Sequence, residues 1–201
     1  MNDALPLGSK RFVIFLHDVP RDGSFSLNDL PGSGGRADVA ARCLTSALLA
    51  SNAIRKDATV AFILNAEAET SLAIIIFGST VRYLNPDERS TASLLRNALL
   101  RSVKATEGFS SPGIYFINAP SAGLLKSISA STTPYYLRED GQPVQSLSIP
   151  FTSFLGDHRD LTEGEEKLLD SAGPKRISIS KRSLHSDQCI VILNWLAENV
   201  G

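Results

Sequence analysis

Three turn-like segments near the C-terminus decide the fold: Tyr136-Leu137-Arg138-Glu139-Asp140-Gly141, Phe154-Leu155-Gly156-Asp157-His158 and Ile177-Ser178-Ile179-Ser180. Each segment leaves an apolar run and precedes a polar loop. In open α/β sheets, ligands bind beyond the carboxyl ends of the strands, where backbone N–H and C=O groups are free. We therefore expect the three segments to converge on one small pocket. A site so late in the chain differs from doubly wound nucleotide-binding enzymes, whose glycine fingerprint follows the first strand.

The rest of the chain shows the alternation that is typical of an α/β protein. Helical patterns separate many of the apolar runs, and no Pro/Gly/Ser-rich linker divides the 201 residues, so we expect one domain over residues 1–201. The predicted strands are Arg11–His17, Thr59–Leu64, Leu72–Phe77, Gly113–Ile117, Phe151–Leu155 and Ile177–Ile179.

Local signals place three helices between these strands. One follows Gly34-Gly35 and carries apolar residues at helical spacing. A second begins at Asn85-Pro86-Asp87-Glu88, with Asn85 as the expected cap, and runs to about Lys104. The third begins at the capping box Thr162-Glu163-Gly164-Glu165 and stops about three turns later, before Gly173-Pro174.

The last predicted helix, from about Ser186 to Asn199, is apolar almost without interruption from Ile190 to Leu196. Such a helix is expected to be buried on more than one side. Insertion into the fold and pairing with a second subunit both satisfy that requirement.

The composition excludes some classes of partner. Lys and Arg number 20 and Asp and Glu 21, so any RNA binding must rely on a local basic patch. Two distant cysteines, Cys43 and Cys189, suit a reducing cytoplasm. Met1-Asn2-Asp3-Ala4 lacks the basic start of a signal peptide, and the run Phe12–Leu16 is too short to span a membrane. We expect a cytoplasmic protein without a membrane contact.

The loop Asp29-Leu30-Pro31-Gly32-Ser33-Gly34-Gly35-Arg36 has two interpretations. Glycines before a helix can expose N–H groups to a phosphate, but the loop lacks the Lys-Ser/Thr ending of a P-loop. An ordinary loop is therefore favoured. Asp38 and Arg42, four residues apart, are expected to pair on a solvated face of the helix.

Histidine and cysteine do not form a metal-binding motif in this sequence. His185 and Cys189 are four apart, yet no further ligand cluster accompanies them, so no metal is expected. Cys189 is either a nucleophile, which needs a base nearby, or a small buried residue beside a cofactor. His158 either binds a ligand or closes a turn, and His17 is expected to be structural.

Several motifs occur in the order found in one known family. The chain resembles the archaeal-type tRNA pseudouridine N1-methyltransferases of the SPOUT superfamily from about residue 11 to its C-terminus. The matching motifs are Asp29-Leu30-Pro31-Gly32-Ser33-Gly34-Gly35-Arg36-Ala37-Asp38, Asn85-Pro86-Asp87-Glu88-Arg89, Pro112-Gly113-Ile114-Tyr115, Tyr135-Tyr136-Leu137, Leu155-Gly156-Asp157-His158 and Leu184-His185-Ser186-Asp187-Gln188-Cys189-Ile190.

This resemblance implies a SPOUT-type Rossmann-like sheet with a C-terminal trefoil knot at about residues 134–201, an exception to unknotted topology. It also implies that the three late turns bind S-adenosyl-L-methionine and that the last helix lies in a homodimer interface. The implied cofactor-binding residues are Tyr136 and Leu137 in the first wall, Leu155, Gly156 and Asp157 in the second, and Ile179, Ser180, Leu184 and Cys189 in the third.

The resemblance further implies methylation of N1 of pseudouridine in tRNA, at position 54 of the T-loop. Asp29 and Asp38 are then candidates for proton acceptance or base orientation, and Arg36 for holding phosphate or the developing negative charge. The substrate base must leave its stack, so backbone and loop shape are expected to dominate RNA binding. The candidate RNA contacts are Arg42, Arg55, Lys56, Arg82 and Arg89.

Some positions depart from the family pattern. Ser186-Asp187-Gln188 replaces a more usual Ala-Asn-His or Ala-Asp-His beside the expected pocket, so a different RNA substrate stays open. Two alternatives therefore accompany the tRNA hypothesis. One is methylation of another RNA, such as ribosomal RNA, and the other is a noncatalytic dimer that binds RNA or the cofactor.

Overall fold

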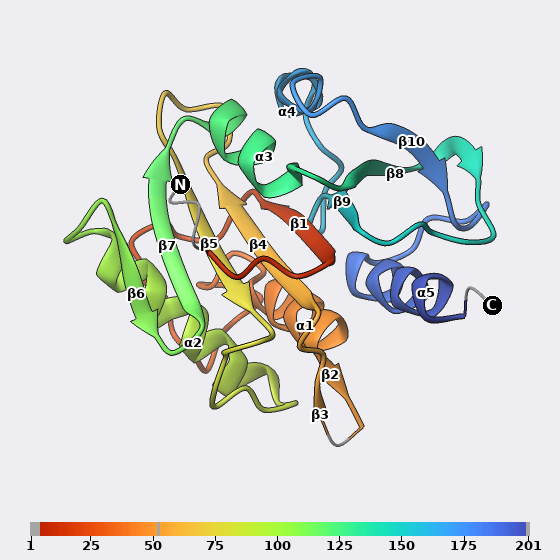
Figure 1. Cartoon of the computed structure of the whole chain (residues 1–201). Coiled ribbons are helices and arrows are strands. Elements are labelled where there is room, and N and C mark those ends of the chain that lie inside the picture. The colour runs from red at the N-terminus through yellow and green to blue at the C-terminus, as the bar shows by residue number, and fades with distance from the viewer. Residues whose placement is uncertain (1–4, 52, 200–201) are drawn as a thin grey trace.

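The central element of the computed structural model is an eight-stranded sheet with the order β10-β8-β9-β1-β4-β5-β7-β6 (Figure 1). The structure describes residues 5–51 and 53–199, so the N-terminal Met1–Ala4 segment lies outside it. The strands are β1 (Lys10–Leu16), β4 (Ala58–Leu64), β5 (Ser71–Phe77), β6 (Glu107–Ser111), β7 (Ile114–Ala119), β8 (Thr133–Pro143), β9 (Phe151–Leu155) and β10 (Lys175–Ser178), with a short hairpin of β2 (Leu49–Ala50) and β3 (Ala53–Ile54).

The sheet is parallel on one side and antiparallel on the other. Strands β10, β8, β9, β1 and β4 pair in parallel. Strands β5, β7 and β6 extend the sheet antiparallel from β4. The α/β class is thus confirmed, with a mainly parallel centre.

Alternation along the buried strands divides the core between two helical layers. Phe12 and Ile14 of β1 face the layer of α1 (Ala37–Leu48), α2 (Glu88–Ser102) and α5 (Ser186–Glu198). Val13 and Phe15 face the layer of α3 (Ser121–Ser129) and α4 (Glu163–Leu169). Because both faces of the sheet are covered, its central strands are continuous apolar runs. Figure 1 shows α3 and α4 on one side of the strands and α1 and α5 on the other.

The local helix signals are mostly confirmed. Thr162 and Glu165 form the expected capping box, with Thr162 Oγ1 accepting from Glu165 N at 3.1 Å and Glu165 Oε2 accepting from Thr162 N at 2.9 Å. Asn85 as the cap of the second helix is wrong: Asp87 is the cap and its carboxylate accepts from Ser90 N at 2.9 Å. Pro86 therefore precedes the helix.

Other boundaries differ from the sequence prediction. Helix α2 ends at Ser102 rather than Lys104, and α4 ends at Leu169 after only seven residues. Strand β10 ends at Ser178, so Ile179 lies in the following loop. The sequence reasoning missed α3, β6 and the β2–β3 hairpin. These elements are short, and their apolar residues are too few to produce a clear period.

Helix α5 packs one face into the chain and leaves another exposed. Ile190, Leu193 and Leu196 belong to the core beside α1. Val191 is 54% exposed and Trp195 61% exposed. Burial on more than one side is therefore not achieved within this chain, and the exposed face is available to a partner.

Candidate functional site

A cavity of about 410 Å³ lies where the predicted walls meet, among β8, β9, β10 and the start of α5. Its volume is within the range of small-molecule sites, about 300 to 1,000 Å³. All of the predicted cofactor-binding residues except Tyr136 line it: Leu137, Leu155, Gly156, Asp157, Ile179, Ser180, Leu184 and Cys189. The expected convergence of the late turns is therefore present in the structure.

The first wall is a bulge in β8. Tyr136 pairs with Arg176 of β10, but the next pair joins Gln142 to Ile177, so the intervening residues of β8 are left out of the ladder. These residues include Leu137, which faces the cavity. A bulge re-aims side chains at the edge of a sheet, and here it turns part of a strand into the wall of the cavity.

Tyr136 itself points to the opposite layer. Its hydroxyl donates to Glu166 Oε1 at 2.8 Å, and the Arg176 guanidinium carbon lies 5.7 Å from its ring centroid. Burial, followed by the contact with Glu166, raises the pKa of Tyr136 to about 12. Successive side chains of a strand point to opposite faces, so Tyr136 points away from the face that its neighbour Leu137 lines. A match of sequence motifs does not take this alternation into account.

The second wall follows β9 and is attached to α5. The Ser186 hydroxyl lies 2.7 Å from the Gly156 carbonyl oxygen and 2.8 Å from that of Asp157, so its single hydrogen is shared between these two acceptors. Ser186 is buried at the first turn of α5. The start of α5 therefore fixes the position of the second wall.

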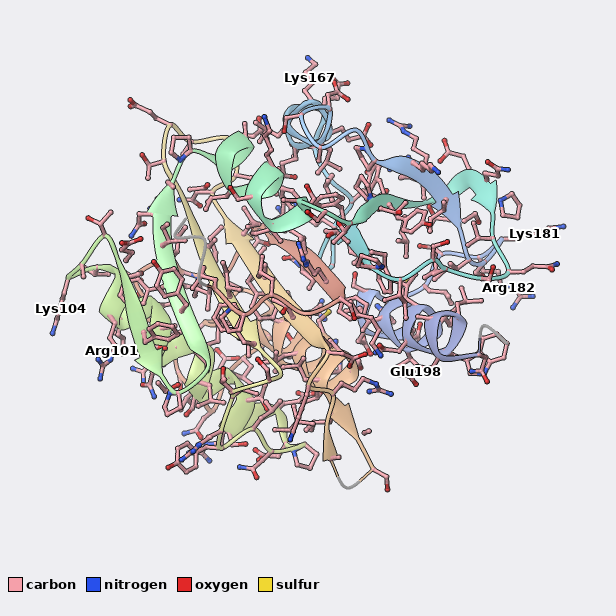
Figure 2. The ribbon with its side chains drawn as sticks, in the orientation of Figure 1. Arg101, Lys104, Lys167, Lys181, Arg182 and Glu198 are labelled. Atoms are coloured by element: carbon pink, nitrogen blue, oxygen red, sulfur yellow. The ribbon has the colours of Figure 1, made fainter. Side chains whose placement is uncertain are left out.

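The third wall is the loop between β10 and α5. Ser178 Oγ donates to the Ser180 carbonyl oxygen at 3.0 Å, and Arg182 N donates to Ser180 Oγ at 3.0 Å. Figure 2 shows the Lys181 and Arg182 side chains projecting outward from this loop.

Cys189 closes the cavity from α5. Burial, followed by the charges of Glu139 and Asp187, raises the pKa of its thiol to about 11. The thiol is therefore neutral at physiological pH and a poor nucleophile. A small packing residue beside the ligand is the better interpretation.

Most of the other lining residues lie within the predicted turn segments or within the third wall: Arg138, Glu139, His158, Ile177, Ser183, His185 and Ser186. Arg159 and Asp160 were not predicted. They follow the second segment directly, so a wider window around that turn would have included them.

A second polar cluster lies at the start of α1. Arg36 binds the Asp38 carboxylate through two nitrogens, Nε to Oδ1 at 3.0 Å and Nη2 to Oδ2 at 3.1 Å. Arg42 Nη1 donates to Asp38 Oδ2 at 2.9 Å. The pairing four residues apart is confirmed, but the solvated face is wrong because Asp38 is only 5% exposed.

Two arginines keep this carboxylate ionised. Burial alone would raise the pKa of Asp38, but the hydrogen bonds from Arg36 and Arg42 outweigh it, so the pKa lies below its usual value. Both carboxylate oxygens are occupied by guanidinium groups. This arrangement suits the orientation of Arg36 better than the acceptance of a proton.

The Asp38 cluster is connected to the wall of the cavity. Arg42 Nε lies 3.8 Å from Asp187 Oδ1 on α5, directly after the lining residue Ser186.

Gly35, at φ +55°, has its α-carbon against the Asp18 carbonyl oxygen, and an added Cβ would overlap that atom. The loop before α1 is thereby held against the chain that follows β1.

The glycine-rich loop satisfies its own backbone. Asp29 is exposed, and its carboxylate accepts from Gly32 N at 3.1 Å and from Ser33 N at 2.7 Å. Gly34 N and Gly35 N donate to carbonyl oxygens within the loop. The bond from Ser33 N is the main cause that holds the pKa of Asp29 below its usual value. The ordinary-loop interpretation is favoured over a phosphate cradle.

The candidate RNA-binding residues separate into two groups. Arg42 and Arg55 form ion pairs, Arg55 with Glu198 at 2.8 Å. Lys56, Arg82 and Arg89 are exposed. Only the second group is free of the carboxylates that pair with the first, according to the ion pairs of residues 5–51 and 53–199.

The part of the chain that the structure describes contains no group of three or more His, Cys, Asp or Glu side chains arranged to hold a metal ion. Within the same residues, none of the helices has the length and apolar character needed to cross a bilayer.

The fold has a solved counterpart. The structure of Nep1 from Archaeoglobus fulgidus, bound to S-adenosylhomocysteine, superposes with a TM-score of 0.64 at 16% identity and covers 96% of this chain and 98% of that one. The architecture is thus that of an α/β protein similar to Nep1.

The sequence comparisons identify the family. Residues 9–199 match the family described as "Putative SAM-dependent RNA methyltransferase". The chain is 44% identical to the tRNA (pseudouridine(54)-N(1))-methyltransferase of Methanosarcina acetivorans over 185 residues, 90% of this chain and 87% of that protein. It is 37% identical to the protein of the same name from Haloarcula marismortui, over 96% and 98% of the two chains. The chain belongs to this methyltransferase family, which confirms the resemblance inferred from the motifs.

Proposed function

We propose that this protein is an enzyme that transfers a methyl group from S-adenosyl-L-methionine to N1 of pseudouridine 54 in tRNA. One observation supports the proposal above the others: the three predicted walls form a cavity of about 410 Å³ in a chain that belongs to this methyltransferase family. The curated relatives carry the same activity in their names.

The cavity suits the cofactor chemically. Leu137, Leu155 and Ile179 supply apolar surface for an adenine ring, and exposed backbone of the turns supplies hydrogen-bonding groups. Glu139 adds a carboxylate at the rim, which favours a ligand that carries a positive sulfonium. When bound, S-adenosyl-L-methionine supplies an electrophilic methyl carbon on that sulfonium.

The residues of this chain align the base and manage its charge. N1 of the base loses its proton and forms a bond to the methyl carbon while the carbon–sulfur bond breaks and the electron pair stays on sulfur. Arg36, fixed by Asp38, holds an RNA phosphate or the negative charge that develops on the base. Asp29 is ionised and exposed, and in this proposal it orients the base or accepts the proton from N1.

The proposed assembly is a homodimer through α5. Val191 and Trp195 are exposed on this helix although the sequence around them is almost continuously apolar. Large exposed apolar side chains on one helix face favour association with a second copy. Because α5 also closes the cavity, the dimer axis would pass close to the site.

A trefoil knot over about residues 134–201 completes the proposed SPOUT-type single domain. The backbone at Gly141 lies so close to the backbone of Ile177 that a Cβ on Gly141 would meet it at 2.5 Å, and Val144 N donates to the Ser178 carbonyl oxygen at 3.1 Å. From β10 the chain then returns from the edge of the sheet to pack α5 beside α1. We propose that the C-terminal part of the chain threads through the β8–β9 connection. We also propose that the enzyme acts in the cytoplasm, where its tRNA substrate is found.

Methyl transfer to a defined tRNA tests the function. Radiolabelled S-adenosyl-L-methionine is offered with one tRNA prepared in two forms, with pseudouridine or with uridine at position 54. Label is expected only in the pseudouridine form, because uridine has no N1–H to lose. Equal labelling of both forms, or none of either, would contradict the proposal.

Replacing Trp195 tests the assembly. Trp195→Glu places a charge on the exposed face of α5, so the variant is expected to elute as a monomer in light-scattering chromatography while the wild type elutes as a dimer. Val103→Glu is the matched control, since Val103 is 64% exposed on a different surface. A wild type that is monomeric, or a Trp195→Glu variant that stays dimeric, would refute the α5 interface.

A further inference from the structure

His17 lies between two carboxylates at the end of β1. Its Nδ1 is 2.7 Å from Asp157 Oδ1, and its Nε2 is 3.0 Å from Glu165 Oε2. The side chains are 10% exposed for His17, 0% for Asp157 and 8% for Glu165. The imidazole therefore bridges two buried acids that are 8 residues apart in sequence and 140 or more residues from it.

Each carboxylate belongs to a different part of the site. Asp157 lines the cavity in its second wall, and its Oδ2 also accepts from the backbone N–H of His17 at 3.0 Å. Glu165 closes the capping box of α4 with the same oxygen that meets His17. One ring thus joins the end of β1, a wall of the cavity and the start of α4.

The ring carries a positive charge through the neutral range. Hydrogen bonds with Asp157 and then Glu165 raise the pKa of His17 to about 10. The other ionisable side chains around it are His158, 3.2 Å from Asp157 Oδ1, Asp18, 3.1 Å from His158 Nε2, and Arg159, which pairs with Asp18 at 2.6 Å. Both ring nitrogens therefore donate, and the cation offsets two buried anions.

A neutral residue at position 17 would leave these acids without their shared partner. Asp157 and Glu165 would then repel each other across a poorly solvated space. Asp157 would keep its hydrogen bonds from the backbone N–H groups of residue 17 and Arg159, but it would lose the cation that offsets its charge, and it lines the cavity. A disturbance at His17 is therefore transmitted to the ligand through the second wall.

We propose that His17 is a positioning residue of the cofactor pocket, which holds the Asp157 wall at a fixed place by bridging it to Glu165 at the start of α4. The inference rests on the proposed function, since it takes S-adenosyl-L-methionine as the ligand of the cavity. His17 does not line the cavity and acts through Asp157.

The test separates binding from turnover in His17→Gln. Calorimetry with S-adenosyl-L-methionine is expected to give a Kd raised about tenfold. The KM for the cofactor should rise by a similar factor while kcat at saturating cofactor stays within about twofold of wild type, because the chemical step uses other residues.

Lys10→Met is the matched control. Lys10 is also a buried cation of β1, with 3% exposure, and it also meets two carboxylates, Asp57 at 3.1 Å and Glu198 at 2.9 Å, but at the other end of the strand. Both variants are expected to lower Tm. Only His17→Gln should weaken cofactor binding, and equal Kd values for the two variants would overturn the proposal.

Nuclear magnetic resonance of the wild-type ring gives an independent readout that needs no variant. Both ring nitrogens of His17 are expected to stay protonated at pH 8, and titration near the ordinary pKa of about 6.5 would overturn the bridge. A wild-type protein that binds no S-adenosyl-L-methionine refutes the proposed function instead, so the two failures are distinguishable.

Discussion

Arg36→Ala is expected to lower kcat by about 10²- to 10³-fold, with the KM for S-adenosyl-L-methionine almost unchanged. The guanidinium is held in one orientation by two hydrogen bonds to the buried Asp38, which prepares its charge before the substrate arrives. Such preorganised charge is worth most in the transition state, and its loss therefore appears in kcat. Steady-state kinetics on tRNA with pseudouridine at position 54 measures both constants.

Two further variants separate the guanidinium from its backbone. Arg36 has φ +67°, a conformation that glycine adopts without strain, so Arg36→Gly removes the side chain and relieves the backbone at once. It is expected to be as slow as Arg36→Ala. Arg101→Ala is the control for loss of one positive charge away from the site. Arg101 lies at the opposite end of the molecule from Lys181 and Arg182, which belong to the third wall of the cavity (Figure 2). If Arg36→Gly had wild-type kcat, no catalytic role for the guanidinium would stand.

Gly156→Ala is expected to weaken binding of S-adenosyl-L-methionine by about 10²-fold or more. An added Cβ would overlap the Arg159 carbonyl oxygen, so the second wall must move. That wall is also held by Ser186 and by Asp157, which prevent a small local adjustment. Calorimetry with S-adenosylhomocysteine gives the Kd without turnover.

Gly123→Ala is the matched control for this substitution. Gly123 lies in α3, and nothing comes within 4 Å of the Cβ that would be added there. Alanine in a helix is favoured over glycine by roughly 0.5 to 1 kcal/mol, so this variant should be slightly more stable and should bind normally. Tight binding by Gly156→Ala would show that the cofactor lies elsewhere. Circular dichroism of both variants is expected to match the wild type, so that a loss of affinity is not caused by unfolding.

The parts of the fold that depend on burial or on local hydrogen bonds were predictable from the sequence. The strands β4 and β5 are buried at every residue, and such strands appear as uninterrupted apolar runs. The Thr162 capping box needs only residues three apart. The β8 bulge was not readable, because it depends on which residues of β10 pair with it.

The chain segments that form the candidate site were predictable from the sequence, but most of the contacts between their side chains were not. Turn positions placed Gly156 at the cavity, since the ends of neighbouring strands meet at one edge, whereas Leu184 was implied by the family resemblance. The partners of His17 lie 140 and 148 residues away in the chain, and no local spacing brings them together. The burial of Asp38 was not predicted for the same reason: it depends on how α1 packs in the fold and not on the pattern of residues along that helix.

Helix α5 takes part in two events at once. Its first turn anchors the second wall through Ser186, Cys189 closes the cavity, and Trp195 stands in the proposed subunit contact. In the proposed dimer, α5 would contact both the cofactor pocket and the second subunit, so a displacement of the helix by one would change its contact with the other. Occupancy of the pocket and association of the chains are then thermodynamically coupled, and the coupling is reciprocal: a cofactor that tightens the dimer is itself bound more tightly by it.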